Sequence, residues 1–471
     1  MEFTGFPDLK RRDAPAEGAP AASQPAVEEG PAIVDVVVKL TEGPRYTINR
    51  IAFTGNTITR DEVIRRELML YEGGVFNTEA LKASVKRLNS LGYFKTLEGS
   101  EKDLKVEKAK DLENAVDITL ALEEQNRNQI QFGAGLSEYE GAFFNLAYTT
   151  ANLMGKGETL TLTGQKGTRS SVYQVAFSEP YAFNRPITAG VDLYSRKVDL
   201  LTGPNTIGYS EARSGVNVTT GRALWRYSRA LLTYGYEVVD TAVSKDLLDS
   251  LQGEGASSPF STLFLESGQH IESRVTPALT TNTVDSPFTP HSGRRITVSL
   301  PIAGGVLGGT TDYIRPEAEA IVYIPHWKKT ALGMRANAGW VRPYGRTSVL
   351  PYYLRYQLGG EYQIRGTDIR TVGPLDSQQR VIGGDKFVLF NAEYYFDVFG
   401  PVRALLFHDA GQAFAENQPI DLRQLRTSTG AELRVVMPML NVPFRLIYAW
   451  NIYRDAFQPA HTFKFAVGTT F

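Results

Sequence analysis

The sequence has no cysteine in its 471 residues, which excludes disulfide bonds and thiol catalysis. It also has no run that approaches the ~18–20 consecutive apolar residues needed by a membrane-spanning helix. The formal net charge is −1, from 50 Lys+Arg against 51 Asp+Glu, so no basic excess points to nucleic acid as a partner. If this chain spans a membrane, it must do so as a β-barrel.

Motifs of common catalytic and cofactor sites are missing as well. The five histidines are scattered over connections and strand ends, and no HExxH, GxSxG or phosphate-binding glycine loop occurs. His408 precedes Asp409, but neighbours on a strand face opposite sides and cannot pair as a base with its orienting acid. We therefore expect no catalytic residue, no cofactor and no metal site.

What the sequence does contain is alternation of apolar with small or polar residues. In the final run, residues 461–471, one face carries Phe463, Phe465 and Phe471, and the other carries small or polar side chains. An alternation of about ten residues is typical of a strand between lipid and a wet lumen. Because an unpaired strand edge cannot lie in hydrocarbon, this ending indicates a closed barrel.

Strand-like runs recur from Gln129 onward, and short turns alternate with long connections. The long connections are expected at 199–210, 241–267, 303–311, 342–385 and 412–423. Outer-membrane barrels have this asymmetry, with short periplasmic turns and long outside loops. The pattern predicts a membrane all-β fold, an antiparallel transmembrane β-barrel of about 16 strands over residues 126–471. A soluble all-β domain fits less well, because soluble sheets rarely have so many strands.

Residues 46–125 are expected to form a separate α+β unit. We expect a strand over 46–56, a helix over 60–70 capped by Thr59, a helix over 79–91 capped by Asn77 or Thr78 and ended by Gly92, and strands at 96–98 and 116–124.

Residues 1–45 contain a partial copy of this unit. GFPDL (5–9) and VDVVVKLTEG (34–43) match GYFKTL (92–97) and VDITLALEEQ (116–125), and a flexible Ala- and Pro-rich segment over 11–32 separates the first two. The start has no apolar core after positive charge, so it is not expected to be a signal peptide. The chain is expected to be a mature or shortened form of a longer protein.

Several motifs resemble the BamA family of outer-membrane assembly proteins. YTINRIAFTGNT and LNSLGYF are similar to its soluble periplasmic repeat, the POTRA domain, and NLMGKGE, FSEPYAF and DSPFTPHSG are similar to its periplasmic turns. IRGTD (364–368) matches the family's Arg-Gly loop motif and FHDAG (407–411) its FxDxG strand. One departure is Thr367, because an aromatic residue normally follows Arg-Gly in the family.

The resemblance implies an insertase of the bacterial outer membrane, with its POTRA domain in the periplasm. It would fold and insert other barrel proteins, so its partners would be outer-membrane lipids, unfolded barrel substrates and periplasmic or lipoprotein accessory subunits. The POTRA-like unit would either bind extended substrate peptides at a sheet edge or act as a rigid spacer. Rival functions are a transporter that secretes passenger proteins, a passive porin, and an outer-membrane lipase or protease.

Arg365 is the first candidate for a functional residue. A loop arginine is usually solvated, but two carboxylates are placed to receive this one. Glu393 and Asp409 fall in the inward phase of their strands, because a carboxylate that faces lipid would cost ~2–4 kcal/mol or somewhat less. The resemblance implies that Arg365 pairs with both, which would dock the loop in the lumen. The flanking motif glycines, Gly366 and Gly411, belong to this candidate site.

The second candidate site is the seam where the first and last strands meet. Gly133 and Gly135 lie on the first strand, and Gly468 and Phe471 lie near the end of the last. Glycine weakens strand interiors, although it can also be merely tolerated on a lumen face. The family resemblance implies a lateral gate at this seam, with local thinning of the bilayer, at which an exposed strand edge pairs with a substrate strand.

Overall fold

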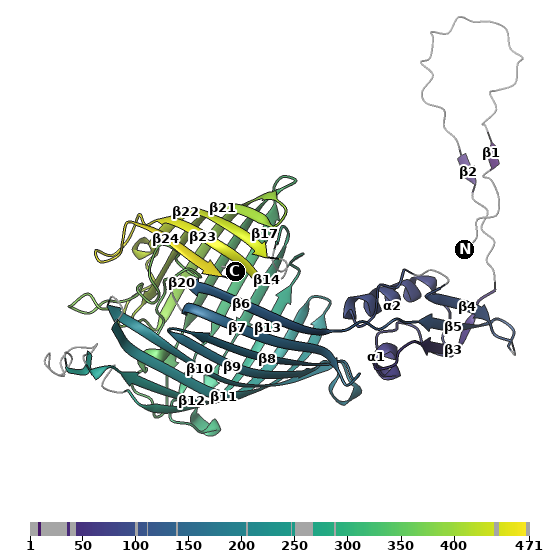
Figure 1. Cartoon of the computed structure of the whole chain (residues 1–471), viewed down its shortest axis with the longest axis horizontal. Coiled ribbons are helices and arrows are strands. Elements are labelled where there is room, and N and C mark those ends of the chain that lie inside the picture. Colours follow the sequence, from purple (N-terminus) through teal and green to yellow (C-terminus); the bar gives the residue numbers. More distant parts are fainter. Residues whose placement is uncertain are drawn as a thin grey trace, which may run out of the picture. The chain divides into compact units, whose positions relative to one another are not determined.

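The computed structural model describes residues 8–10, 35–37, 44–98, 102–110, 112–137, 140–203, 206–245, 247–249, 267–286, 289–437 and 442–467. The chain divides into two compact units, Met1–Gln125 and Asn126–Phe471 (Figure 1). Ahead of the α+β unit, β1 (Asp8–Lys10) pairs antiparallel with β2 (Asp35–Val37). The segment expected to be flexible, 11–32, lies outside the described residues. Among the described residues, no helix is long and apolar enough to cross a membrane.

The α+β unit contains a three-stranded sheet and two helices. Its elements are β3 (Thr47–Thr54), α1 (Asp61–Arg65), α2 (Thr78–Leu91), β4 (Leu104–Lys108) and β5 (Ala115–Ala121). The sheet order is β3-β5-β4, with β3 parallel and β4 antiparallel to β5. The expected ends of α2 are confirmed. Asn77 accepts hydrogen bonds from the amides of Glu79 and Ala80, and Gly92 ends the helix in the left-handed conformation.

Two details of the expected α+β unit were wrong. The helix expected over 60–70 is only α1, and Thr59 does not cap it. The chain leaves the helical path after Arg65, and the Met69 amide donates to Ser84 Oγ on α2 at 2.8 Å. Residues 96–98 form no strand, since Leu97 exchanges two hydrogen bonds with the Asn89 side chain instead of joining a ladder. The strand that pairs antiparallel with β5 is β4.

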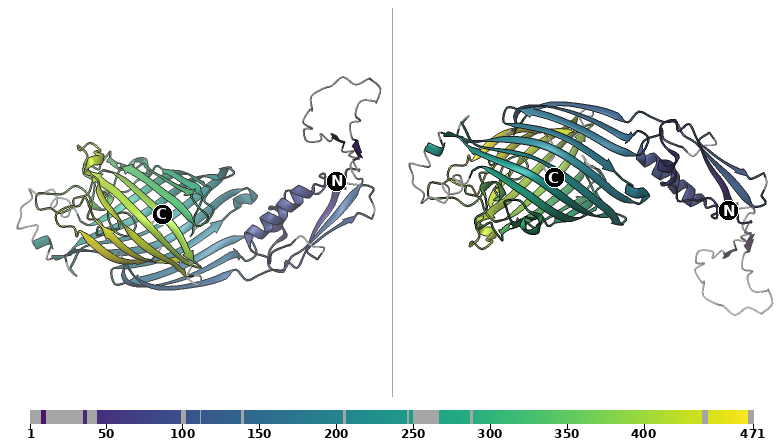
Figure 2. Two further views of the ribbon diagram at one scale, coloured as in Figure 1. Left: turned by 90° about the horizontal axis from the view of Figure 1, so that it is seen from above. Right: turned by 90° about the horizontal axis from the view of Figure 1, so that it is seen from below.

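The second unit is a closed antiparallel barrel of sixteen strands, which confirms the expected fold class (Figure 2). Three of these strands are interrupted, so β14 and β15, β16 and β17, and β18 and β19 each lie along one strand of the barrel. The segments are β6 (Asn128–Ser137), β7 (Gly141–Leu153), β8 (Glu158–Gly167), β9 (Ser170–Glu179), β10 (Ile187–Gly203), β11 (Thr206–Trp225), β12 (Ser228–Val243), β13 (Gln269–Asn282), β14 (Gly293–Ser299), β15 (Ile302–Ala303), β16 (Tyr313–Ile314), β17 (Glu317–Pro325), β18 (Thr330–Trp340), β19 (Arg342–Pro343), β20 (Lys386–Phe399), β21 (Val402–Phe414), β22 (Arg426–Met437), β23 (Val442–Trp450) and β24 (His461–Val467).

The two faces of the barrel differ as expected for a membrane barrel. On β12, Leu232 and Tyr234 are 47% and 41% exposed on the outer face, whereas Glu237 is almost fully buried on the lumen face. One expected loop was wrong, because β10 and β11 continue through most of 199–210 and pair as far as Gly203 with Thr206. Long-range pairing thus overrides the turn-like composition of that segment.

The long connection between β19 and β20 lies in the lumen. It contributes buried side chains to a cluster that also contains residues of the wall. The loop members are Leu350, Tyr353, Leu354, Tyr356, Leu358, Ile364 and Val372, and the wall members include Val239 on β12, Phe387 and Leu389 on β20, and Ala413 on β21. We call residues 344–385 the lumen loop. Its burial against these strands places Arg365 on the inner wall.

Candidate functional site

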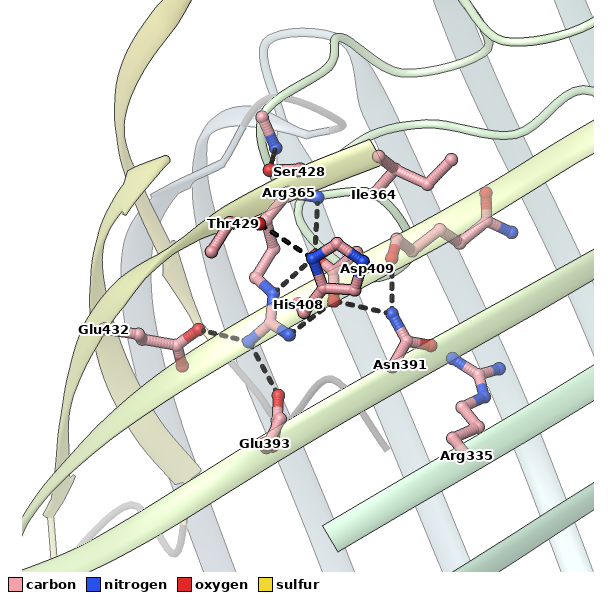
Figure 3. A network of polar contacts seen from close by, with 12 residues as sticks. Arg335, Ile364, Arg365, Asn391, Glu393, His408, Asp409, Ser428, Thr429 and Glu432 are labelled. Carbon is pink, nitrogen blue, oxygen red and sulfur yellow. Dashed lines mark hydrogen bonds and ion pairs between the residues drawn. The ribbon is translucent and has the colours of Figure 1, made fainter. Parts of the chain in front are cut away.

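Arg365 is fully buried and contacts three carboxylates on neighbouring strands (Figure 3). Its Nε and Nη2 donate to the two carboxylate oxygens of Asp409 on β21, at 2.8 and 2.6 Å. Its Nη1 donates to Glu393 Oε1 on β20 at 2.6 Å. The Arg365 amide also donates to Asp409, at 3.1 Å. The fork-like pairing with Asp409 fixes both the position and the orientation of the lumen loop.

A third carboxylate, Glu432 on β22, was not anticipated from the sequence. It accepts from Arg365 Nη1 at 3.0 Å, and from Arg434 and Arg445 on β22 and β23 at 2.5–2.9 Å. Arg434 also donates to Glu393 Oε1 at 2.8 Å. The sequence did contain a sign of this third carboxylate. In AELRVV, Glu432 and Arg434 lie on the same face of the strand, and only the lumen side of the wall accommodates both charges.

This cluster balances three arginines against three carboxylates in a site closed to solvent. Arg365, Glu393 and Glu432 each have side chains that are 0% exposed. Buried charges are tolerated when they are paired and hydrogen-bonded, and removal of one partner leaves an uncompensated charge. The guanidinium carbon of Arg365 also lies 3.7 Å from the ring centroid of Phe407, which packs one face of the guanidinium. The cluster is therefore a rigid anchor.

The two motif glycines allow the lumen loop to lie close to the wall. A Cβ at Gly366 would stand 1.8 Å from Asn451 Oδ1 and 2.6 Å from Ser428 Oγ. The Gly366 amide donates to Ser428 Oγ at 3.0 Å, and its carbonyl accepts from Asn451 Nδ2 at 2.6 Å. A Cβ at Gly411 would stand 3.1 Å from Leu358 Cδ1 of the loop. Gly366 therefore needs to lack a side chain for the loop to dock, whereas at Gly411 a Cβ would only be in tight contact with the loop.

Thr367, which replaces the usual aromatic residue, is 1% exposed. Its hydroxyl donates to the Ile364 carbonyl at 2.9 Å and closes the turn around Arg365. Its carbonyl accepts from Lys464 Nζ on β24 at 2.7 Å. The departure from the family motif thus leaves Arg365 docked, with a local hydrogen bond in place of an aromatic contact.

A second ionic cluster lies on another part of the wall and was also missed by the sequence reasoning. Arg213 on β11 and Arg274 on β13 share Glu237 on β12, at 2.9 and 3.3 Å. The lumen loop reaches this cluster through Arg370, which lies 3.6 Å from Glu211, and through Tyr353, whose ring lies 5.2 Å from the Arg213 guanidinium carbon. The loop is therefore held at two separate regions of the barrel wall.

The seam residues are only partly within the described structure. β24 is next to β6 in the closed order, and β24 pairs with β23 from Trp450 with His461 to Phe444 with Val467. A Cβ at Gly133 would meet no atom within 4 Å, whereas one at Gly135 would stand 2.9 Å from Val467 Cγ2. Gly468 and Phe471 lie outside the described residues.

The sequence offered one tempting catalytic pair, and the structure separates it. His408 Nδ1 lies 2.7 Å from Thr429 Oγ1 and its side chain is exposed, while Asp409 is fully buried. In the described part of the chain, no group of three His, Asp or Glu side chains is arranged to hold a metal ion. The chemistry of the site is electrostatic docking of a loop.

Comparison with known families gives two matches that together span most of the chain. Residues 152–471 match the model of the Omp85 superfamily domain, and residues 46–125 match the POTRA model, described as a surface antigen variable number repeat. Together the two models cover the α+β unit and the barrel from the end of β7 onward.

Individual relatives carry related names. The chain is 28% identical to outer membrane protein assembly factor BamA of Nitratidesulfovibrio vulgaris over 93% of this chain and 53% of that protein. It is 25% identical to BamA of Neisseria meningitidis over 93% of this chain and 58% of that protein. A sorting and assembly machinery component 50 homolog of Xenopus laevis is 23% identical over 74% of this chain and 70% of that protein. The chain thus spans about half the length of the BamA relatives it matches.

Solved structures show the same fold. BamA from Haemophilus ducreyi lacking POTRA domains 1-3 matches with a TM-score of 0.73 at 22% identity, over 92% of this chain and 86% of that one. CdiB from Acinetobacter baumannii matches with a TM-score of 0.58 at 11% identity, over 90% of this chain and 74% of that one.

Proposed function

Since the chain belongs to the Omp85 superfamily, we propose that it is an insertase that folds β-barrel proteins and inserts them into the bacterial outer membrane. The α+β unit lies in the periplasm, and the partners are unfolded barrel proteins and outer-membrane lipids, with accessory subunits on the periplasmic side. The observation that carries this proposal is the lumen loop. It occupies the barrel interior and is fixed to two regions of the wall, by Arg365 and by Arg370.

A loop held in this way argues for a substrate route along the seam. A porin or a transporter that uses the lumen would need the loop to leave, which would expose the buried carboxylates of Glu393, Asp409 and Glu432. Separation of β24 from β6 involves a first strand with two glycines, Gly133 and Gly135, on its lumen face. The exposed edge can pair with a substrate strand by β-augmentation.

No nucleotide or catalytic group is needed for this reaction. The free energy of the substrate falls when its apolar face enters lipid. It falls again when its strand ladder closes, since unpaired backbone groups in hydrocarbon each cost several kcal/mol. The seam lowers the barrier by offering an edge on which the first substrate strand can form. Hydrolysis by an outer-membrane lipase or protease would instead need a nucleophile and base within reach of each other.

The α+β unit has one sheet edge suited to binding extended peptides. The outer edge of β3 is already covered, because Ile48 donates to the Gly74 carbonyl at 2.8 Å and Phe76 donates to the Tyr46 carbonyl at 2.8 Å. β4 pairs with β5 on one side, and no other described strand pairs with it. Peptide capture at β4 and a role as a rigid spacer remain the two proposals for this unit.

Reconstitution tests the proposed function. The purified chain is placed in phospholipid vesicles, and a urea-unfolded eight-stranded barrel protein is diluted into them. We expect protease-resistant, folded substrate to form at least several-fold faster than with empty vesicles or with vesicles that contain an unrelated porin. Equal rates would contradict insertase activity. Large, steady conductance of the chain in planar bilayers would support the porin alternative.

A further inference from the structure

The lumen loop contacts the last strand of the barrel as well as the ionic cluster. The Tyr362 hydroxyl donates to the backbone carbonyl of Val467 at 2.6 Å. Lys464 Nζ donates to the Thr367 carbonyl at 2.7 Å and pairs with Asp368 at 3.3 Å. These contacts flank Arg365 on both sides in sequence. The last strand is therefore bound to a segment of the loop that is itself anchored to the wall.

Tyr362 is held in position from two directions. Arg335 on β18 donates to the Tyr362 carbonyl at 3.3 Å, and Arg335 pairs with Glu319 at 2.8 Å. The guanidinium carbon of Arg445 lies 5.8 Å from the centre of the Tyr362 ring. Because the phenol is already oriented, little conformational entropy is lost when it binds the strand.

The described end of β24 contacts the lumen face of the first strand. Phe463 is 70% exposed on the outer face, and simple alternation would place Val467 on that face too. Instead, Val467 Cγ2 lies 2.9 Å from where a Cβ of Gly135 would stand. Gly135 pairs with Phe143, which lies on the same face of β7 as Asn145. The side-chain amide of Asn145 donates to Gln165 in the lumen, so this face is the lumen face. The missing side chain at Gly135 leaves room for Val467 at this point.

We propose that Tyr362 and Lys464 form a latch that holds β24 on the docked lumen loop and sets how often the seam opens. This inference rests on the proposed function, because it assigns the regulation of the same seam. For β24 to move away, the Val467 carbonyl must exchange the Tyr362 hydroxyl for another donor. Lys464 must also give up its two partners on the loop. The Arg365 cluster keeps the loop in place while this happens, so the latch opens without undocking the loop.

Double electron–electron resonance tests the latch in the full chain. Because the chain has no cysteine, spin labels can be placed at F132C and F463C, which replace outward-facing residues that are 58% and 70% exposed on β6 and β24. Tyr362→Phe removes only the hydroxyl. The matched control is Tyr356→Phe, which removes another hydroxyl of the same loop that donates to Glu317 at 2.9 Å on β17.

We expect Tyr362→Phe to raise the ratio of separated to joined seam about fivefold, the effect of one ordinary hydrogen bond. Tyr356→Phe should leave this ratio unchanged, and Lys464→Met should raise it further when combined with Tyr362→Phe. Identical distance distributions for Tyr362→Phe and the parent would overturn the latch. The insertion assay on the same samples separates the two proposals. A parent that inserts substrate but shows no Tyr362-dependent shift loses only the latch, whereas a shift in a parent that inserts nothing leaves the latch and removes the insertase.

Discussion

The wall around Arg365 and the closing seam are parts of one barrel, but they are held together in opposite ways. On the wall, Arg365 makes charge-assisted hydrogen bonds to three carboxylates, and all the charged ends are buried. At the seam, Gly133 and Gly135 contribute no side chains. The interaction described there between the last strand and the lumen loop is a latch of a phenol and an ammonium group.

Under the proposed function, this difference separates the wall, which resists change, from the seam, which opens. Removing one partner of a buried ion pair typically costs 3–5 kcal/mol, whereas one hydrogen bond contributes about 1 kcal/mol. A structure that must open at one line and stay closed elsewhere needs this contrast. Variants of Arg365 and Gly366 weaken the wall side of this contrast, and a cross-link at the seam removes its freedom to open.

The largest effect is expected from Arg365→Met, which keeps the length of the side chain but removes its charge. Glu393, Asp409 and Glu432 would be left with excess negative charge in a buried site, at a cost of about 3–5 kcal/mol. We expect a folded barrel in which the lumen loop is cleaved readily by added protease and insertion is strongly impaired. A strain that relies on this variant should grow poorly, and normal growth would count against the anchor.

A smaller effect is expected from Gly366→Ala, because a Cβ would stand 1.8 Å from Asn451 Oδ1. Crowding of this kind costs about 1–3 kcal/mol and pushes the loop off the wall. The matched control is Gly373→Ala in the same loop, where the nearest atom would lie 3.2 Å away. Protease sensitivity of the loop should rise for the first variant and change little for the second.

The smallest effect concerns Glu124 in the α+β unit, which tests what a partly exposed carboxylate contributes. Burial raises its pKa, but hydrogen bonds from Thr59, Thr57 and Ile58 outweigh this and lower its pKa to about 2. Because the folded pKa is depressed, the stabilisation is present above pH 4.5 and is lost as the pH falls towards 2. We expect less than about 1 kcal/mol, given its solvent exposure.

Amide hydrogen exchange checks this pH dependence. Protection of the Ile58 and Thr59 amides, relative to Glu124→Gln, should decline as the pH is lowered from 5 to 2, because the bonds they donate weaken when the carboxylate is protonated. A difference that does not change with pH would show that the carboxylate charge is irrelevant there.

Much of this organisation could be predicted from local sequence. Phase along two strands was enough to place Glu393 and Asp409 on the lumen side, because a strand has a period of two. Helix α2 followed from its cap residues. The sequence indicated a strand at 96–98 instead of 104–108. Whether Leu97 joins a ladder depends on the side chain of Asn89, eight residues away, which local patterns do not show. The loop expected at 199–210 was also wrong, because pairing between β10 and β11 overrides the turn-like composition of this segment.

The rest of the site depends on contacts that are distant in sequence. Glu432, Arg434 and Arg445 join Arg365 only because β22 lies beside β21 and β23 lies beside β22. The contact of Tyr362 with Val467 spans 105 residues, and no local pattern indicates it. Alternating charge on β22 was a usable signal that the sequence reasoning passed over.

A cross-link across the seam is the most direct test of the account. The substitutions G135C and V467C would introduce the single disulfide of the chain, across the seam. The matched control is S195C with S214C. These two serines pair between β10 and β11, and their hydroxyl oxygens are 2.9 Å apart. We expect oxidation of the seam pair to abolish insertion of substrate into vesicles, reduction to restore it, and the control pair to insert normally in both states. Full insertion with the seam covalently closed would contradict the central claim that substrates enter the membrane through this seam.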